Sequence, residues 1–283
     1  MIVPIVKSVV TGLASMALFG SMALESYVRL PQKVMFGSTP VPLQNFTEDS
    51  VFLIFPGYGG PDLNTERIET ELRDSDKSLG EKRFVYCYDW SQWRGNLIRA
   101  AFDGQRVGKL IGEQLGCKRC ETDGTLQVHN LHVVGISVGA FAADMCIKEY
   151  KRQVAKLYGK DVTDTISTRL TLLDPFTSRG VVGQSYGPKY FGLEADYFEH
   201  YLNTDDPVPF TNDPLPNAYT YDVTNAKERN DFVPLEGDNM HSWPVAFFGL
   251  NWKRRIDPRV KDSAVFGPPD HKKKPRGTVI RID

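Results

Sequence analysis

The residues best suited to chemistry are a serine and its two flanking glycines, in Gly135-Ile136-Ser137-Val138-Gly139. The largely apolar run Leu131–Val134 comes before them, and a helix-compatible segment follows. A strand-to-helix turn of this kind is tight and strained, and it exposes the serine hydroxyl in a cleft. The backbone N–H of Val138 would lie at a helix N-terminus, where it can stabilise an oxyanion. The pattern predicts Ser137 as a nucleophile; the alternative is a plain Gly/Ser turn.

An oxyanion needs a second donor, and a glycine-rich turn after an earlier strand can supply it. Phe55-Pro56-Gly57-Tyr58-Gly59-Gly60 follows the apolar run Val51–Phe55. Consecutive glycines let the backbone approach a reacting carbonyl closely, so the N–H of Tyr58 is expected to pair with that of Val138. A simple turn is again the alternative. Asp89-Trp90, after the next strand, is expected to be structural, with indole rings closing the pocket wall.

A serine nucleophile needs a base, and the chain has five histidines. Only His241 falls in a loop after the last expected strand, just before a short helix that Ser242 is expected to cap and that starts near Pro244. The others precede the serine, lie inside an expected strand or belong to the basic C-terminal region: His129, His132, His200 and His271. Elimination therefore favours His241, in the chain order Ser…Asp…His.

Two aspartates between the serine and this histidine could orient the imidazole. Asp174 ends the run Leu170–Leu173, and Asp206 lies in the segment Asn203–Pro209. Each is at the carboxyl end of an expected strand, where it could accept the imidazole N–H and fix its tautomer. The other aspartate would then make turn hydrogen bonds. The residues themselves leave the choice open.

Apolar runs alternate with amphipathic stretches along the chain, which predicts an α/β fold with a mostly parallel twisted sheet and helices on both faces. Functional residues of such sheets gather at the carboxyl ends of the strands. The expected strands are 51–55, 84–88, 131–134, 170–173, 198–202 and 219–223, and the expected helices are 65–73, 96–115, 138–153 and 244–250.

Several of these motifs, in order, resemble the family of lipases that contains pancreatic lipase. The resemblance covers roughly residues 51–248 and rests on Phe52–Tyr58, Cys87–Trp90, the serine motif, Leu173-Asp174-Pro175 and Asp231–Pro234. It implies an α/β-hydrolase fold with Ser137 as nucleophile, His241 as base, Asp174 as acid, and Tyr58 and Val138 as the oxyanion hole. Because Asp206-Pro207-Val208-Pro209 resembles the acid motif of fungal-type lipases, Asp174 is only narrowly preferred over Asp206.

The activity implied by this resemblance is hydrolysis of carboxylic esters, in acyl lipids or in small esters, through an acyl-enzyme and without a cofactor. No metal-binding constellation stands out. The first alternative is a catalytically weak or inactive lipase-like protein that binds lipids. An acyltransferase or a peptidase would use the same three side chains.

The chain ends suggest where such a protein works. A net charge of -1 over 283 residues predicts no nucleic-acid partner. Residues 1–30 are expected to be a signal peptide or a membrane anchor, residues 31–252 the lipase-like domain, and residues 253–283 a basic, solvated tail. A secreted or membrane-associated protein follows, with organelle targeting and a buried N-terminal helix as alternatives. For an exported chain, Cys117 and Cys120 would form a small disulfide loop.

Overall fold

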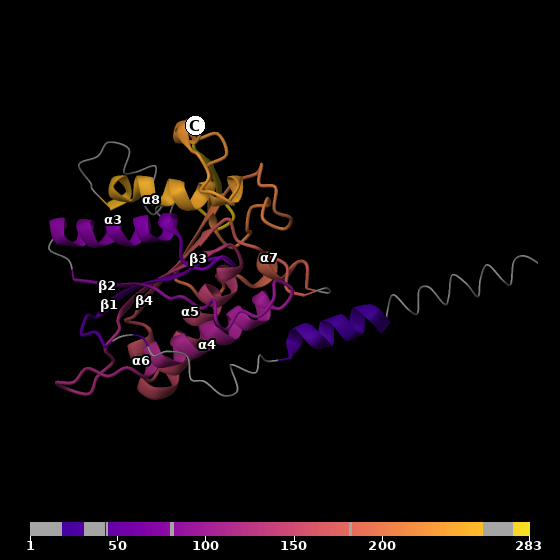
Figure 1. Cartoon of the computed structure of the whole chain (residues 1–283). Helices are drawn as coiled ribbons and strands as arrows, with labels where there is room; N and C mark the ends of the chain where they lie inside the picture. The colour runs from indigo at the N-terminus through magenta and orange to yellow at the C-terminus, as the bar shows by residue number, and fades with distance from the viewer. Residues whose placement is uncertain (1–18, 31–42, 44, 80–81, 181–182, 257–273) are drawn as a thin grey trace, which may run out of the picture.

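A parallel sheet forms the centre of the molecule, covered by helices on both faces (Figure 1). The computed structural model describes residues 19–30, 43, 45–79, 82–180, 183–256 and 274–283. Seven strands lie in the order β2-β1-β3-β4-β5-β6-β7, and every pairing between neighbours is parallel. The protein therefore has an α/β fold, and the predicted parallel sheet with two helical layers is confirmed.

The elements alternate along the chain as the sequence predicts. The strands are β1 Ser50–Phe55, β2 Phe84–Cys87, β3 Asn130–Ile136, β4 Ser167–Leu173, β5 Tyr197–Leu202, β6 Tyr219–Asp222 and β7 Val279–Arg281. The α-helices are α3 Leu63–Leu79, α4 Ala100–Cys117, α5 Ala140–Tyr158, α6 Lys160–Thr163, α7 Tyr186–Tyr190 and α8 Trp243–Ile256. Three short 3₁₀ helices are η1 Ser137–Gly139, η2 Lys227–Asp231 and η3 Met240–Ser242.

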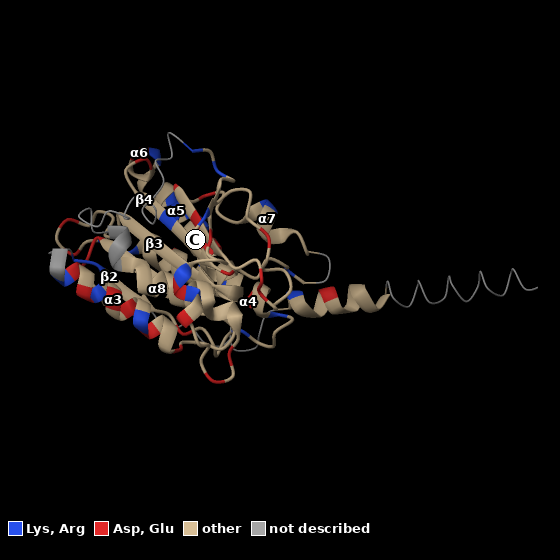
Figure 2. Ribbon diagram, turned by 90° about the horizontal axis from the view of Figure 1, so that it is seen from above, with Lys and Arg blue, Asp and Glu red and all other residues tan. Residues whose placement is uncertain are grey.

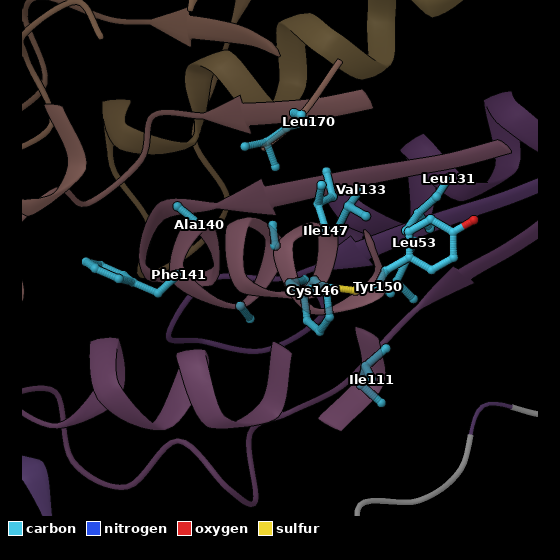
Figure 3. Packing of buried hydrophobic residues seen from close by; sticks show 14 of the residues in the cluster. Leu53, Ile111, Leu131, Val133, Ala140, Phe141, Cys146, Ile147, Tyr150 and Leu170 are labelled. Carbon is cyan, nitrogen blue, oxygen red and sulfur yellow. The ribbon is translucent and has the colours of Figure 1, made fainter. Parts of the chain in front are cut away.

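The two faces of the sheet bury two separate apolar clusters, because successive strand side chains point to opposite sides. On one face, Leu53 and Val133 point toward α4 and α5. They belong to the same apolar cluster as Phe141, Ile147 and Tyr150 of α5 (Figure 3). Phe52 and Val134 face the other way, toward α3 and α8 (Figure 1). This arrangement fixes the carboxyl ends of the central strands between two rigid helical layers.

Helices α4 and α5 approach so closely that glycine is required between them. A Cβ at Gly108 would overlap the carbonyl oxygen of Ala142 and lie 2.8 Å from its carbonyl carbon. We expect Gly108→Ala to lower the free energy of unfolding by about 2 kcal/mol or more, because the displaced neighbour is backbone and overpacking costs that much. The cost should exceed the helix-propensity gain of about 1 kcal/mol. Urea unfolding followed by circular dichroism measures it.

Gly104 in the same helix is the matched control for Gly108. Its Cβ would come no nearer than 3.4 Å to Trp90 and 3.5 Å to Ala142, which is ordinary van der Waals contact. Gly104→Ala should therefore leave stability unchanged or raise it slightly. Equal destabilisation by the two variants would show that the contact with Ala142 is not the cause.

The expected elements are recovered with shifted ends, and the largest differences concern the chain ends. The stretch assigned to a tail contributes β7, which pairs in parallel with β6 through Tyr221 and Ile280, so the sheet continues past the expected domain end at residue 252. Residues 257–273, including His271, and the apolar residues 1–18 lie outside the described part. Residues 19–29 form a mostly exposed helix. Among the described residues, none of the helices combines the length and apolar character needed to cross a bilayer.

The cysteines are free thiols in this structure, and Cys117 and Cys120 are not bonded to each other. Cys146 is buried, whereas Cys87 is only partly buried. Burial raises the pKa of Cys87 to about 12, and the nearby Glu69 and Asp89 carboxylates add to the rise. A thiol with such a pKa is a poor nucleophile at neutral pH.

Candidate active site

The strand order places the carboxyl ends of β1 and β3 at the point where open parallel sheets usually bind ligands. The chain moves from β1 outward to β2 and then returns to the other side of β1 with β3, so the direction of winding reverses between β1 and β3. Open parallel sheets bind ligands outside the carboxyl ends at such a reversal. Phe55, the last residue of β1, pairs with Gly135 of β3. The turn after β1 and the Ser137 turn therefore lie side by side.

Ser137 occupies a strained turn between β3 and α5. Its φ of 50° is in the left-handed region, which costs a non-glycine residue about 1–3 kcal/mol and is found most often at functional sites. Both flanking glycines are required by close approach. A Cβ at Gly135 would lie 2.7 Å from the Cα of Ala140, and one at Gly139 would lie 2.5 Å from the carbonyl oxygen of Pro56. The spacing of glycine and serine in the sequence thus has a steric cause.

The turn after β1 lies against this serine. A Cβ at Gly57 would be 3.5 Å from the Cβ of Ser137. The buried Trp90 side chain supports this turn, because its Nε1–H donates to the carbonyl oxygen of Pro56 over 2.8 Å. Trp90 is therefore structural, as predicted, although it supports the turn and does not line the cavity wall. The Arg94 guanidinium lies over the Tyr58 ring, with its central carbon 4.1 Å from the ring centre.

His241 lies on the loop before α8, at the same edge of the sheet. It belongs to η3, and its backbone N–H donates to the Asn239 side chain over 2.8 Å. Asn239 thus caps η3, whereas Ser242, which the sequence suggests as the cap of the next helix, directly precedes α8. The Ser242 hydroxyl donates to the Asn239 carbonyl oxygen. These bonds fix the backbone that carries the imidazole, and α8 begins one residue after Ser242.

Both predicted aspartates reach the same nitrogen of His241. Nδ1 is 2.6 Å from Oδ2 of Asp206, in hydrogen-bond geometry, and 3.3 Å from Oδ2 of Asp174. Asp174 follows β4 with a φ of 46°, and Asp206 lies in the loop after the adjacent β5. The narrow sequence preference for Asp174 is therefore not reflected in the geometry, which gives Asp206 the shorter, aligned contact.

The two carboxylates have different supports. Asp206 accepts from the Thr211 hydroxyl and from the N–H of Val208. Asp174 accepts from the N–H of Asn203, at 3.2 Å, and its Oδ2 has no hydrogen-bond partner among the described residues. Asp206 is therefore held by a fuller set of donors, which favours its charged form.

Asn203 is a site residue that sequence reasoning missed. Its backbone N–H contacts Asp174, and its side-chain amide donates to the carbonyl oxygen of Met240, next to His241. It is completely buried. In the sequence it is only the first residue of the Asp206 segment, and nothing in its local pattern indicates a contact across 37 residues.

The titration of the three groups follows from their burial and proximity. Burial raises the pKa of Asp174 to about 7, although the His241 contact acts to lower it. Burial also acts on Asp206, but hydrogen bonds from His241 and Thr211 hold its pKa below the usual value. For His241 burial acts to lower the pKa, and the two carboxylates outweigh it and raise the pKa to about 9. Asp206 is thus the carboxylate that stays charged at neutral pH.

Ser137 and His241 line one cavity of about 350 Å³. The turn after β1 and the loop 235–238 form its other walls. Nε2 of His241 is buried and has no hydrogen-bond partner among the described residues. A larger groove of about 810 Å³ between α3, α8 and η2 shares Leu235 with the cavity, but the described residues that line it include no histidine, serine or cysteine. We therefore place the candidate site in the smaller cavity.

The other histidines of the described residues, His129, His132 and His200, lie away from this cavity. His132 contacts the Thr171 hydroxyl from within β3, and His129 precedes that strand. His200 is fully buried in β5, and burial lowers its pKa to about 3, so it stays neutral. Elimination from sequence therefore selects the histidine that the fold brings into the same cavity as Ser137.

The same three side chains also carry donor types that metals bind. One imidazole nitrogen and two carboxylate oxygens, from His241, Asp174 and Asp206, lie within 4.8 Å of one another. The 2.6 Å contact between Nδ1 and Asp206 is short for an N–H···O bond, as charge-assisted hydrogen bonds are, and a proton between the two atoms explains it without an ion. No protein-family model matches this sequence, and a search of curated proteins finds no significant match.

Proposed function

We propose that the protein is a serine hydrolase that cleaves carboxylic esters. The observation that carries the proposal is that a strained serine and a histidine with a carboxylate on its Nδ1 line one cavity. A hydrogen bond from Nδ1–H to a carboxylate selects the tautomer whose Nε2 is a free base. Ser137 is then the nucleophile, His241 the base and Asp206 the first acid, with Asp174 as a second carboxyl beside it.

The reaction would proceed through an acyl-enzyme. Oγ of Ser137 attacks the ester carbonyl carbon, and its proton passes to Nε2 of His241. The same proton goes to the alkoxide as it leaves. Water then attacks the acyl-serine, gives one proton to Nε2, and the acid is released as the serine is re-protonated. The N–H groups of Tyr58 and Val138 would stabilise the oxyanion in both steps.

Acyl lipids are the favoured substrate class, because the ordered motifs resemble the pancreatic-lipase family. The groove beside the cavity offers apolar side chains for an acyl chain, Leu63, Phe232, Val233 and Leu250, although charged residues such as Glu66 and Glu228 also line it. The alternative is a lipase-like protein that binds such lipids without cleaving them.

A fluorophosphonate probe tests the proposal. An activated Ser137 should displace fluoride and form a covalent phosphonyl ester, which mass spectrometry locates on the peptide that contains it. Ser167→Ala, at the opposite edge of the sheet, should label as the native protein does. Absence of an adduct on the folded protein would favour lipid binding. Inhibition by a chelator, reversed by a divalent cation, would instead indicate a metal-dependent site.

The rate of ester cleavage should rise steeply as the pH becomes alkaline. His241 must be neutral to act as a base, and its pKa is raised to about 9. We therefore expect kcat/KM to rise with pH through the range 7 to 9, by about tenfold for each unit well below the pKa. A pH–rate profile with a soluble ester measures this. A rate that is already constant between pH 6 and 8 would contradict the assignment.

A further inference from the structure

The helix of residues 19–29 is held at the edge of the molecule where the strands have their carboxyl ends. Arg99 and Arg106 of the α4 region donate to the carbonyl oxygens of Leu30 and Arg29, at the end of this helix. The fully buried Asp103 pairs with Arg106 at 2.6 Å and with Arg99 at 3.6 Å. Because α4 begins after the carboxyl end of β2, the helix is attached at the edge where Ser137 lies.

The rest of this helix points away from the domain and exposes apolar side chains. Figures 1 and 2 show it extending outward, beyond the end of the molecule where α7 lies. Its only charged residues are Glu25 and Arg29, which pair with each other at 2.7 Å. Phe19 is 70% exposed and Met22 58%. The preceding 18 residues of the sequence contain one charge, Lys7, so apolar character continues toward the N-terminus.

Further large apolar side chains are exposed after the carboxyl ends of the strands, on loops and at the start of α3. They come from four segments, each after the carboxyl end of a different strand: β1, β2, β5 and β6. Exposed apolar residues scattered singly need no explanation, but several on loops that meet at one edge indicate a binding surface. These residues are Leu63, Leu97, Ile98, Phe210 and Val233, and their exposed fractions range from 45% to 80%.

Phe210 is held outward at a conformational cost. Its φ of 68° is rare for a bulky residue, and its carbonyl oxygen accepts from both the N–H and the hydroxyl of Thr177. The ring packs edge-on against Phe176, three residues from the end of β4. Strain of this kind persists only where the surroundings enforce it. The loop is thus built to present an aromatic ring at the edge of the site.

We propose that this edge, formed by the helix 19–29 and these five exposed apolar side chains, docks on an electrically neutral lipid surface. A lipid surface fits because the apolar groups come from separate segments along the edge, and only Leu63 and Val233 line a common groove. Neutral lipid fits because the cavity is lined by Asp62, Glu236 and Asp238 and by no Lys or Arg among the described residues. Acidic side chains there would repel anionic headgroups within a Debye length.

Tryptophan placed on the edge tests the docking directly. In Ser137→Ala, which removes hydrolysis from the readout, Leu97→Trp and Val233→Trp are compared with Leu157→Trp, which lies at the end of α5 on the opposite edge. The native tryptophans are at most 2% exposed, so they contribute little quenching. With vesicles of brominated phosphatidylcholine, the emission that the tryptophan at position 97 or 233 adds to that of Ser137→Ala alone should fall roughly twofold, because docked apolar groups enter the acyl boundary. Emission from position 157 should stay constant.

Partitioning provides a second measurement. Leu97→Asp and Met22→Asp should each weaken binding to phosphatidylcholine vesicles by about tenfold, and Leu157→Asp should not. Equal quenching at all three positions, unaltered partitioning of the edge variants, or binding that requires anionic lipid would each overturn the proposal. Loss of fluorophosphonate labelling without loss of docking would count against the hydrolase alone, because docking involves no chemistry.

Discussion

Replacing Ser137 with alanine should reduce ester hydrolysis by a factor on the order of 10³ to 10⁶, with the fold retained. His241→Ala should produce a loss of similar size, because the nucleophile and the base act as one unit. The double variant should be hardly worse than either single variant. Initial rates with a short-chain nitrophenyl ester measure these losses, and circular dichroism checks the fold.

Controls for this result are available at the opposite edge of the sheet. Ser167 begins β4 and His129 precedes β3, so both are remote from the cavity. Ser167→Ala and His129→Ala should each retain turnover within about twofold, as surface substitutions usually do. Full activity in Ser137→Ala would remove the proposed mechanism, whatever the behaviour of the other variants.

The second large effect is expected from Asp206. In Asp206→Asn the amide can donate to Nδ1 and force the imidazole into the wrong tautomer, which lowers turnover by about 10⁴ in comparable triads. Asp174→Asn should cost far less, on the order of tenfold, because Asp206 still accepts the Nδ1 proton. It should also shift the alkaline rise in rate to lower pH, since one of the two carboxylates that raise the pKa of His241 is lost.

Asp205→Asn is the matched control for this comparison. Asp205 is the neighbouring residue, is exposed, and pairs with Arg229 at 3.1 Å. Its replacement should leave both turnover and the pH profile unchanged. A greater loss in Asp174→Asn than in Asp206→Asn would reverse the assignment of the acid. Two fully active aspartate variants would mean that neither carboxylate orients His241.

Much of the fold could be predicted from local patterns. The alternation of apolar runs and amphipathic stretches predicted every central strand, because a strand covered on both faces is apolar over most of its length. It did not predict β7. Only two of the three residues of β7 are apolar, Val279 and Ile280, and they lie within a basic stretch. The segment forms a strand because it pairs with the otherwise unpaired edge of β6.

The candidate site divides in the same way. Ser137 could be predicted because its turn is made by neighbouring residues, whose glycines meet steric limits within a few positions. Asn203 could not, because its role consists of contacts between β5, Asp174 and the loop before α8. Nothing in a local pattern distinguishes such an asparagine from one in an ordinary turn.

By itself, the sequence determined the order of the layers, the strained serine turn and the histidine that elimination leaves. Only the tertiary structure decided which aspartate hydrogen-bonds to that histidine. Asp174 and Asp206 both follow neighbouring parallel strands, so strand order brings both toward Nδ1 of His241. The difference between 2.6 and 3.3 Å then depends on how the loop 203–211 folds around Thr211. Periodicity specifies the faces of helices and strands, but such distances result from packing between distant segments.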